Sequence, residues 1–272
     1  MAMLEAKGML LGKDIPEMPY GIGIFYSAKC PLCYWPRSFL WIFIYHSDIY
    51  SQIINMSYLE KGGDELEVMT TVRYNLSFTA GGLLYRESID IAELYLALRD
   101  WKAVKTRVHD SNLIKSRTLS SSIRICREIL LRLALLNDDE LNILIEGSRQ
   151  EQLNILWLAI CRRHRFIYDF AVEVVREKYL RLDTEVRQED YDVFFNARAD
   201  WHPELEELSD STRGKLRQVI FRMMREAEVL NKNNTINPGM LTPDFVKTVV
   251  KHSRSDLTIF PASDLEIREL LQ

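Results

Sequence analysis

The sequence predicts a mainly α-helical, multi-helix globular protein, and three observations support this fold class. Only 11 Gly and 8 Pro occur in 272 residues, and a low content of helix breakers, with many Leu, Arg and Glu, favours helices. From residue 70 onward, apolar residues recur every three or four positions, which is the spacing of one helix face. Ser, Thr, Asp or Asn precedes several of these segments, as N-cap residues do.

Residues 1–70 do not share this pattern and are expected to form an atypical N-terminal extension. Their most apolar run is far shorter than the roughly 20 residues that cross a bilayer. Cys30 and Cys33 form a CxxC motif, but no second ligand pair follows, so no zinc site is predicted. The change in composition after Met69 motivates a hypothesis: residues 1 to about 68 are upstream sequence, read through from an early start codon.

Residues 83–110 predict two helices. Apolar residues recur at helical spacing from Leu83 to Leu98. Asp100 is the predicted N-cap of the next helix, which places Val104 and Val108 on one side. This second helix is short and rich in lysine and arginine.

The segment "TLSSSIRICREILLRLALL", at 118–136, predicts a longer amphipathic helix. Its apolar side is expected to be buried and comprises Ile123, Cys126, Ile129, Leu130 and Leu133. Its polar side comprises Ser120, Arg124, Arg127, Glu128 and Arg132. Between Arg99 and Arg132 there are nine basic and three acidic residues, a local net charge of +6 in a chain whose net charge is −4. A short helix, a turn and a longer helix with an Arg/Ser-rich start is the layout of a helix-turn-helix, although such a face can also be merely solvated.

Residues 137–185 predict further helices around apolar side chains. Asn137 to Glu140 is a typical helix start, with acidic residues near the positive end of the dipole. The residues expected to pack inward are Leu153, Leu156, Trp157, Ile160, Phe166, Phe170, Val174 and Tyr179. His164 has no partner at metal-ligand spacing and is interpreted as a surface or hinge residue. The flanking Arg162, Arg163 and Arg165 are interpreted as a salt-bridged helix end.

A second helix-turn-helix candidate follows near the C-terminus. A short helix is predicted at 188–198, and Ser209 to Ser211 supply caps for a long helix. The buried side of that helix is predicted to be Leu216, Val219, Ile220, Met223 and Ala227. The opposite side comprises Gly214, Lys215, Gln218, Arg222 and Arg225, side-chain types that reach phosphates and base edges.

The remaining C-terminal residues complete a winged-helix-like plan. The Asn-, Gly- and Pro-containing stretch at 231–243 is compatible with a small β-hairpin wing. A helix is predicted from Thr242, followed by a short extended stretch within 255–260 and a terminal helix. We therefore expect an N-terminal helical domain at 71–146, central helices at 147–185 and a C-terminal winged-helix-like domain at 186–272.

The candidate site is a DNA-binding surface rather than a catalytic centre. The candidate residues are Lys102, Lys105, Arg117, Ser120, Ser121, Arg124, Arg127, Lys215, Gln218, Arg222 and Arg225. No phosphate-binding loop, metalloprotease motif or nucleophile elbow is present in the sequence, so we predict a protein that is not an enzyme and has no cofactor or metal. Cys126 and Cys161 lie in apolar patterns and are expected to be buried and reduced, which favours a cytoplasmic location.

From about Val72 to Arg268 the chain resembles the BrxA family, accessory proteins of the bacteriophage exclusion (BREX) defence islands. The stretches that carry the resemblance include "YNLSFTAGGLLYRESIDIAELYL", "WKAVKTRV", "RTLSSSIRICREI", "EGSRQEQLNILWLAICRRHRFIYDFAVEVVREKYLRLD", "FFNARADWHPELEELSDSTRGKLRQVIFRMMREAEVL" and "LTIFP". Residues 1–70 have no counterpart in this pattern.

The resemblance implies an all-helical fold with helix-turn-helix or winged-helix elements, binding to double-stranded DNA, and a role in phage resistance without catalysis. Other BREX proteins are the implied partners, and a monomer is favoured. Two alternatives stay open: a scaffold for larger defence proteins, and an RNA-binding protein like the antitermination factor NusB. The family has also been labelled an inner-membrane protein, but no spanning segment in the sequence supports that, and no membrane association is expected.

Overall fold

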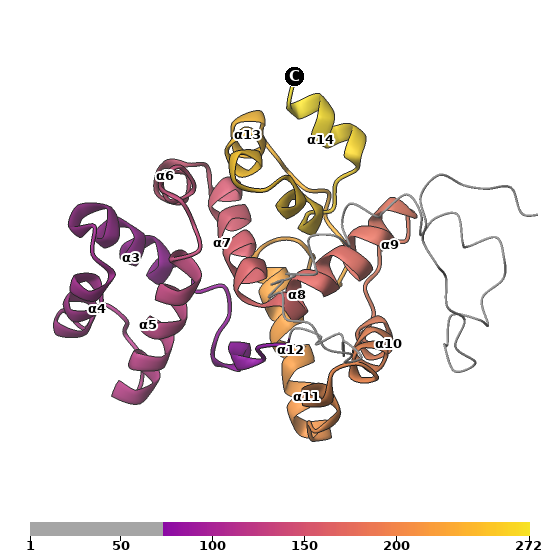
Figure 1. Ribbon diagram of the computed structural model, residues 1–272, viewed down its shortest axis with the longest axis horizontal. Helices are drawn as coiled ribbons and strands as arrows, with labels where there is room; N and C mark the ends of the chain where they lie inside the picture. The colour runs from indigo at the N-terminus through magenta and orange to yellow at the C-terminus, as the bar shows by residue number, and fades with distance from the viewer. Residues whose placement is uncertain (1–72) are drawn as a thin grey trace, which may run out of the picture. The chain divides into compact units, whose positions relative to one another are not determined.

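The computed structural model describes residues 73–272, and the described part is built from helices (Figure 1). The predicted extension at 1–70, with its CxxC motif and proposed upstream start, lies outside the described residues. The α-helices, in chain order, are α3 (Tyr85–Leu98), α4 (Trp101–Asp110), α5 (Leu119–Leu133), α6 (Asp138–Glu146), α7 (Arg149–Arg163), α8 (Arg165–Phe170), α9 (Glu177–Leu180), α10 (Gln188–Ala199), α11 (Pro203–Glu206), α12 (Asp210–Glu226), α13 (Pro243–His252) and α14 (Asp264–Leu270). The mainly α fold class is therefore confirmed.

Three short segments of other helix types complete the described chain. Ser77–Ala80 (η3) and Arg254–Ile259 (η5) are 3₁₀ helices. Ala171–Arg176 (η4) is a π-helical segment that joins α8 to α9 without a break. Of the stretch before the predicted terminal helix, Arg254–Ile259 forms η5, and extended backbone follows it, at Phe260 and Ser263.

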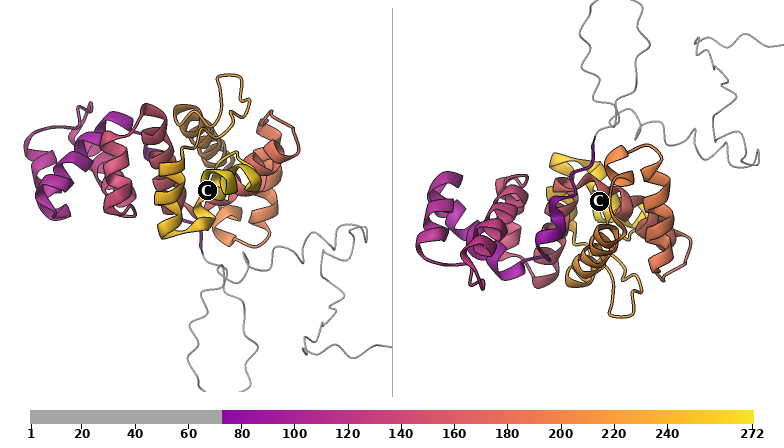
Figure 2. Two further views of the ribbon diagram at one scale, coloured as in Figure 1. Left: turned by 90° about the horizontal axis from the view of Figure 1, so that it is seen from above. Right: turned by 90° about the horizontal axis from the view of Figure 1, so that it is seen from below.

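Helices α3, α4 and α5 lie side by side in both views of Figure 2 and contact one another. The Asp100 side chain caps α4 by accepting a hydrogen bond from the Lys102 backbone N–H, as predicted. The rings of Tyr95 and Trp101 stack at 3.8 Å and hold the end of α3 against the start of α4. Val104 and Val108 are buried, which confirms the predicted inner side of α4.

Helix α7 is the most deeply buried helix of the described part. Every residue from Leu153 to Cys161 is buried, so the helix is enclosed on all sides rather than on one. It contacts α3, α5, α6, α8, α12 and η5. The predicted inward packing of Trp157 and its neighbours is confirmed, as is the burial of both Cys126 and Cys161.

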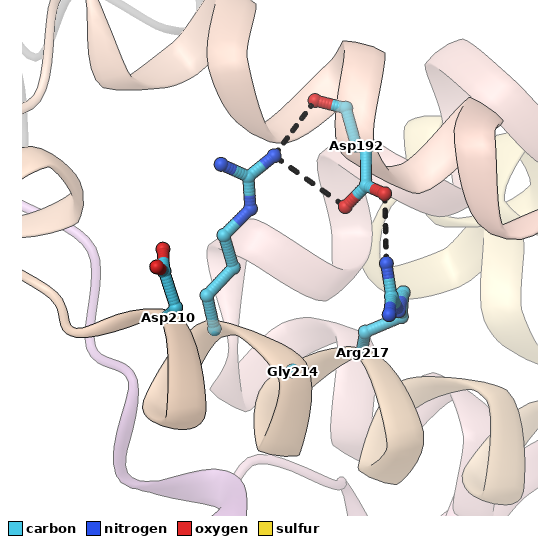
Figure 3. Close-up of a pocket in the computed structure, with 5 residues that line it drawn as sticks. Asp192, Asp210, Gly214 and Arg217 are labelled. Atoms are coloured by element: carbon cyan, nitrogen blue, oxygen red, sulfur yellow. Dashed lines mark hydrogen bonds and ion pairs between the residues drawn. The ribbon is translucent and has the colours of Figure 1, made fainter.

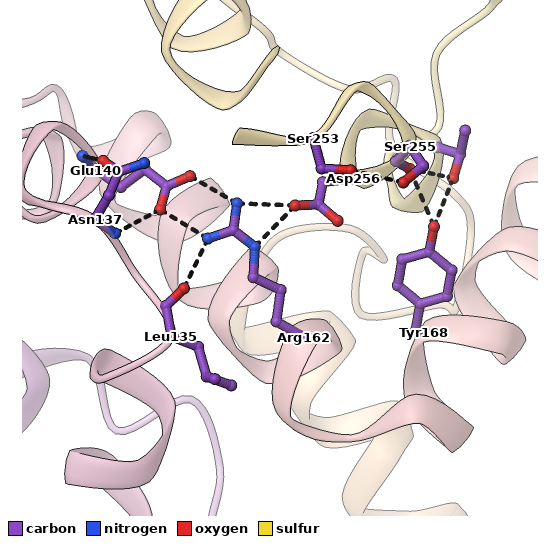
Figure 4. Close-up of polar contacts among 9 residues, drawn as sticks. Leu135, Asn137, Glu140, Arg162, Tyr168, Ser253, Ser255 and Asp256 are labelled. Carbon is purple, nitrogen blue, oxygen red and sulfur yellow. Dashed lines mark hydrogen bonds and ion pairs between the residues drawn. The ribbon is translucent and has the colours of Figure 1, made fainter. Parts of the chain in front are cut away.

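Arg162 ties the end of α7 to two other segments, as Figure 4 shows. Its guanidinium forms two 2.7 Å hydrogen bonds with the buried Glu140 carboxylate of α6 and one of 2.8 Å with Asp256 of η5. It also donates to the carbonyl of Leu135, beyond the end of α5. The predicted salt-bridged helix end is confirmed for this residue and for Arg165, which pairs with Asp169.

His164 is not a surface residue, which corrects the sequence-based interpretation. Its side chain is fully buried at the junction of α7 and α8. Its Nε2 lies 2.7 Å from Glu128 Oε1, and the same carboxylate oxygen accepts a 2.9 Å hydrogen bond from Arg132 Nε. The buried carboxylate thus bonds Arg132 Nε and His164 Nε2, while His164 Nδ1 and the second terminal nitrogen of Arg132 have no hydrogen-bond partner among the described residues, and His164 is part of the core.

The C-terminal part packs aromatic side chains between helices. Phe166 and Phe170 of α8 make edge contacts with Tyr191 and Phe194 of α10. Ser209 caps α12 as predicted, and the predicted buried side of that helix is confirmed. One turn of helix, α11, occupies the predicted turn between α10 and α12.

The predicted β wing has no strand in the described chain. Two isolated antiparallel bridges occur there, between Leu230 and Ile236 and between Glu185 and Thr235. The helix-turn-helix assignments and the division at residues 146 and 185 stay predictions. None of the helices within 73–272 is long and apolar enough to cross a membrane.

Gly214 occupies an unusual place, in the second turn of α12. It lines a small hollow of about 270 Å³ with Asp192, Asp210, Arg213 and Arg217, and both arginines donate to Asp192 of α10 (Figure 3). A Cβ atom at Gly214 would have no neighbour within 4 Å. The glycine is therefore not needed for close packing among the described residues.

Gly214→Ala is expected to raise the free energy of unfolding by about 0.5–1 kcal/mol, because alanine loses less backbone entropy in a helix interior than glycine. Thermal unfolding followed by circular dichroism measures the change. Gly82→Ala, outside the helices, provides the contrast and should lower stability, because its Cβ would displace the Glu226 carboxylate from its hydrogen bond with the Leu83 backbone N–H. A lower melting temperature for Gly214→Ala would show that the hollow has a structural role.

Candidate nucleic-acid interface

The strongest charge feature of the described chain lies on α4, on the linker at 111–118 and on the first half of α5. Seven basic side chains are exposed there and form no ion pair with another described residue: Lys102, Lys105, Arg107, Lys115, Arg117, Arg124 and Arg127. We call this set the α4–α5 basic patch. Arg99 and Arg132, which bound the same stretch of sequence, are neutralised by Asp138 and Glu128. The positive charge is thus concentrated on this part of the surface.

The start of α5 presents hydroxyl groups within this patch. Thr118 is the N-cap, and its Oγ1 accepts a hydrogen bond from the Ser121 backbone N–H (3.2 Å). The same hydroxyl also bonds the side chain of Ser121 and lies 3.2 Å from that of Ser120. No acidic residue occurs in the first turn, so the positive end of the helix dipole is not compensated. Such a terminus favours a phosphate group.

The sequence-based helical wheel placed three residues of α5 wrongly. Ile123 was predicted to be buried but is exposed, whereas Glu128 and Arg132 were predicted on the polar side but are buried. The reason is that α5 is covered along two sides. One side packs on α3 and α4, and the other meets α7, η3 and the backbone of Gly82. The exposed side is therefore narrower and centres on Arg124 and Arg127.

A second exposed polar face lies on α12. Lys215 and Gln218 are exposed and bond no other described side chain. Arg222 and Arg225 are exposed too, but each already serves a protein acceptor: Arg222 donates to the carbonyl of Gly81 and Arg225 to Asn234 Oδ1. The four polar side chains are all exposed on α12. Only Lys215 and Gln218, however, have every hydrogen-bond donor available for a ligand.

Gly81 and Gly82 form a short strap that links the two long helices. Arg132 of α5 donates to the Gly82 carbonyl at 3.0 Å, and Arg222 of α12 donates to the Gly81 carbonyl at 2.5 Å. Glu226 of α12 accepts a 2.5 Å hydrogen bond from the backbone N–H that follows the strap. The preceding η3 contacts both α5 and α12. The two faces are thus joined through this strap, and no hydrogen bond or ion pair within 73–272 joins them directly.

Arg222→Gln is expected to lower the free energy of unfolding by about 1–2 kcal/mol, because the Gly81 carbonyl loses a charged donor. Lys215→Gln, two turns earlier on the same face, should leave stability unchanged because the Lys215 side chain bonds no group within 73–272. Urea unfolding of both variants makes the comparison. Equal stability of the two variants would mean that the strap does not depend on Arg222.

The described residues provide neither a metal-binding cluster nor a reactive thiol. Among the described residues, no group of three or more His, Cys, Asp or Glu could hold a metal ion. Burial raises the pKa of the Cys126 thiol, and it raises that of Cys161 well above its ordinary value. Both thiols are therefore poor nucleophiles at neutral pH. What the surface does offer is free positive charge, hydroxyl groups and a helix N-terminus.

Comparison with known proteins assigns the chain to a family. The sequence model of BrxA matches residues 72–253. The chain belongs to the BrxA family. All eleven candidate DNA-binding residues of the sequence analysis lie within the matched range, and the resemblance to this family is confirmed.

Two curated BrxA relatives cover most of their own length in the match. The BREX protein BrxA of Escherichia coli O9:H4 (strain HS) is 25% identical over 179 residues, which span 65% of this chain and 84% of the relative. The BREX protein BrxA of Bacillus cereus (strain H3081.97) is 28% identical over 152 residues, 56% of this chain and 76% of the relative.

A solved structure shares the fold. The crystal structure of an uncharacterized protein from Magnetospirillum magneticum superposes with a TM-score of 0.61 at 18% sequence identity. The similarity covers 70% of this chain and 100% of that chain. It establishes a common helical fold and carries no functional information.

Proposed function

We propose that this BrxA-family protein is a non-catalytic accessory protein of a bacterial BREX phage-defence system that binds double-stranded DNA through the α4–α5 basic patch. One observation carries the proposal: seven exposed basic side chains, without ion-pair partners among the described residues, lie on two packed helices and the linker between them, in a chain whose net charge is −4. Local clustering of this kind is the electrostatic footprint of a nucleic-acid site.

Unpaired basic groups are more informative than basic groups in general. A basic side chain that already has a carboxylate partner must exchange this partner for a phosphate, so it contributes little to the free energy of DNA binding. A free base that neutralises a phosphate releases condensed counterion from the duplex, which drives association and makes it salt-dependent. The ion-paired Arg99, Arg162 and Arg165 therefore contribute less than Arg124 or Lys115.

The two faces have unequal roles in this proposal. The α4–α5 basic patch supplies the main phosphate contacts, with Ser120 and Ser121 at the N-terminus of α5. On α12, Lys215 and Gln218 extend the contact, while Arg222 and Arg225 hold the strap and the loop after α12 as well as facing outward. The helix-turn-helix plan would place α5 in the major groove.

Fluorescence anisotropy of a labelled duplex, titrated with the protein at several salt concentrations, tests the proposal. We expect binding at low salt that weakens steeply as salt rises. Unlabelled duplex should compete better than structured RNA, whose deep, narrow major groove does not admit an α-helix. Stronger competition by RNA would favour a NusB-like function, and no duplex binding at low salt would contradict the proposal.

A scaffold role is the second candidate, and exposed aliphatic side chains favour it. Leu182 and Val193 are 87% and 70% exposed and lie outside the α4–α5 basic patch. Apolar side chains of this size are commonly covered by a protein partner, although isolated ones are ordinary. Co-purification with other BREX proteins from nuclease-treated extract tests this role. Partners that are lost after nuclease treatment would mean that DNA, and not this protein, holds them together.

A further inference from the structure

Two aliphatic side chains are exposed on α5, at the edge of the α4–α5 basic patch. Leu119 and Ile123, at the start of α5, are 65% and 48% exposed. They are one helical turn apart and therefore neighbours on the helix surface. Ser120, Arg124 and Arg127 lie on the same exposed side.

These two residues are not required to complete the core. The buried apolar residues of α5 are Cys126, Ile129 and Leu133, and the helix contacts α3 and α4. Full burial of a Leu or Ile side chain stabilises a structure by about 1.5–3 kcal/mol. A partner that covers the pair would therefore bind more tightly. A single exposed aliphatic residue needs no explanation, whereas adjacent exposed apolar residues bordered by polar ones are typical of an interaction site.

The charge around the pair restricts the kind of partner. Arg117 precedes it, Arg124 and Arg127 lie on its exposed side, and none of the three forms an ion pair with a described residue; the first turn of α5 contains no acidic residue. The complementary surface must therefore be strongly anionic and must also offer small apolar groups at the depth that a helix reaches. The major groove of DNA has both properties. It admits an α-helix between two phosphate rows, and each thymine places a C5-methyl group on its floor.

We propose that Leu119 and Ile123 contact thymine methyl groups in the major groove and give the protein a preference for thymine-containing sites. This inference rests on the proposed DNA binding and adds base readout to a contact otherwise made with phosphates. The N-terminal residues of a recognition helix are the ones that face base edges, and Leu119 is the first residue of α5. The arginines fix the helix on the backbone while the aliphatic pair reads the groove.

The decisive experiment compares two duplexes that differ only in the methyl group. One contains alternating adenine and thymine, and in the other uracil replaces every thymine. We expect the wild-type protein to bind the thymine duplex about two- to fourfold more tightly for each methyl group contacted. In the Leu119→Ala, Ile123→Ala double variant this ratio should fall to about one. The salt dependence should not change, because no phosphate contact is removed.

Leu265→Ala is the matched control, since Leu265 is also 65% exposed but lies on α14. It should keep the wild-type preference. Equal binding of the two duplexes by the wild-type protein would overturn the inference and leave the proposed function intact. A folded double variant that keeps the wild-type ratio of affinities for the thymine and uracil duplexes would overturn it in the same way. Failure to bind either duplex at low salt would overturn both proposals.

Discussion

Reversal of charge at Arg124 and Arg127 is expected to weaken duplex binding on the order of 100-fold at low salt. Both side chains are exposed on α5 and have no ion-pair partner among the described residues. The slope of log affinity against log salt concentration should become shallower by about 1.8, since each lost phosphate contact removes about 0.9. Fluorescence anisotropy of the Arg124→Glu, Arg127→Glu variant over a salt series measures both quantities.

The control for this experiment is the Arg254→Glu, Arg268→Glu double variant, which makes the same change of four charge units at exposed positions of η5 and α14. It alters the net charge of the protein without touching the α4–α5 basic patch. We expect its affinity to fall only a few-fold and its salt slope to stay at the wild-type value. If both variants lose affinity equally, binding depends on overall charge and not on this surface.

The largest effect on stability is expected from Glu128→Gln, with a loss of about 3 kcal/mol in the free energy of unfolding at pH 7. Glu128 bonds both Arg132 and His164, and all three side chains are buried. Its removal leaves the Arg132 charge buried and uncompensated, and loss of one partner from a buried pair is costly. Urea unfolding followed by circular dichroism gives the value.

The same residue predicts a dependence on pH. Burial alone would raise the pKa of Glu128, but the hydrogen bond from His164 and the charge of Arg132 outweigh burial and hold this pKa at about 2. A lowered carboxyl pKa stabilises the native state above the unfolded-state pKa, and this stabilisation is lost as pH falls towards 2. The stability difference between wild type and Glu128→Gln should therefore shrink by about 1.5 kcal/mol between pH 7 and pH 3.5.

Glu177→Gln is the matched control for this prediction. Glu177 also pairs with an arginine four residues later, Arg181, but that pair is exposed. Exposed pairs contribute less than about 1 kcal/mol, so little change is expected at either pH. A loss below 1 kcal/mol for Glu128→Gln as well would show that the buried contact does not stabilise the fold.

Helix starts could be predicted from the sequence because the interactions that make them are local. Asp100, Asn137, Ser209 and Thr242 each accept a hydrogen bond from a backbone N–H two or three residues later, as N-cap residues should. The side chain and its partner lie within one turn, and no distant residue is needed. The residue type and the pattern that follows it are therefore enough.

Burial could not be predicted where it depends on contacts distant in sequence. His164 is in the core because Glu128, 36 residues earlier, lies beside it. Arg132 is buried because the Gly82 carbonyl, 50 residues earlier, accepts from it. A helical wheel assumes one buried side, and α5 has two. The same reason explains why Ile123 was expected inside and lies outside.

The candidate interface was predictable in part. The excess of basic residues between Arg99 and Arg132 is visible in the sequence, but which of them are free is not. Arg99 and Arg132 form ion pairs with carboxylates on other turns or helices. Arg107 and Lys115 were not among the predicted site residues, yet both are exposed and form no ion pair with a described residue. Arg222 is the converse case: a predicted contact residue that also supports the strap.

Hydrogen–deuterium exchange of the wild-type protein, with and without duplex DNA, tests the central claim most directly. We expect exchange to slow in peptides that cover 101–127, above all at the linker and the start of α5, with a smaller effect at 211–225. Peptides from 254–272 should not change. Slower exchange confined to other regions, or none in 101–127 at saturating duplex, would contradict the assignment of the α4–α5 basic patch as the DNA-binding surface.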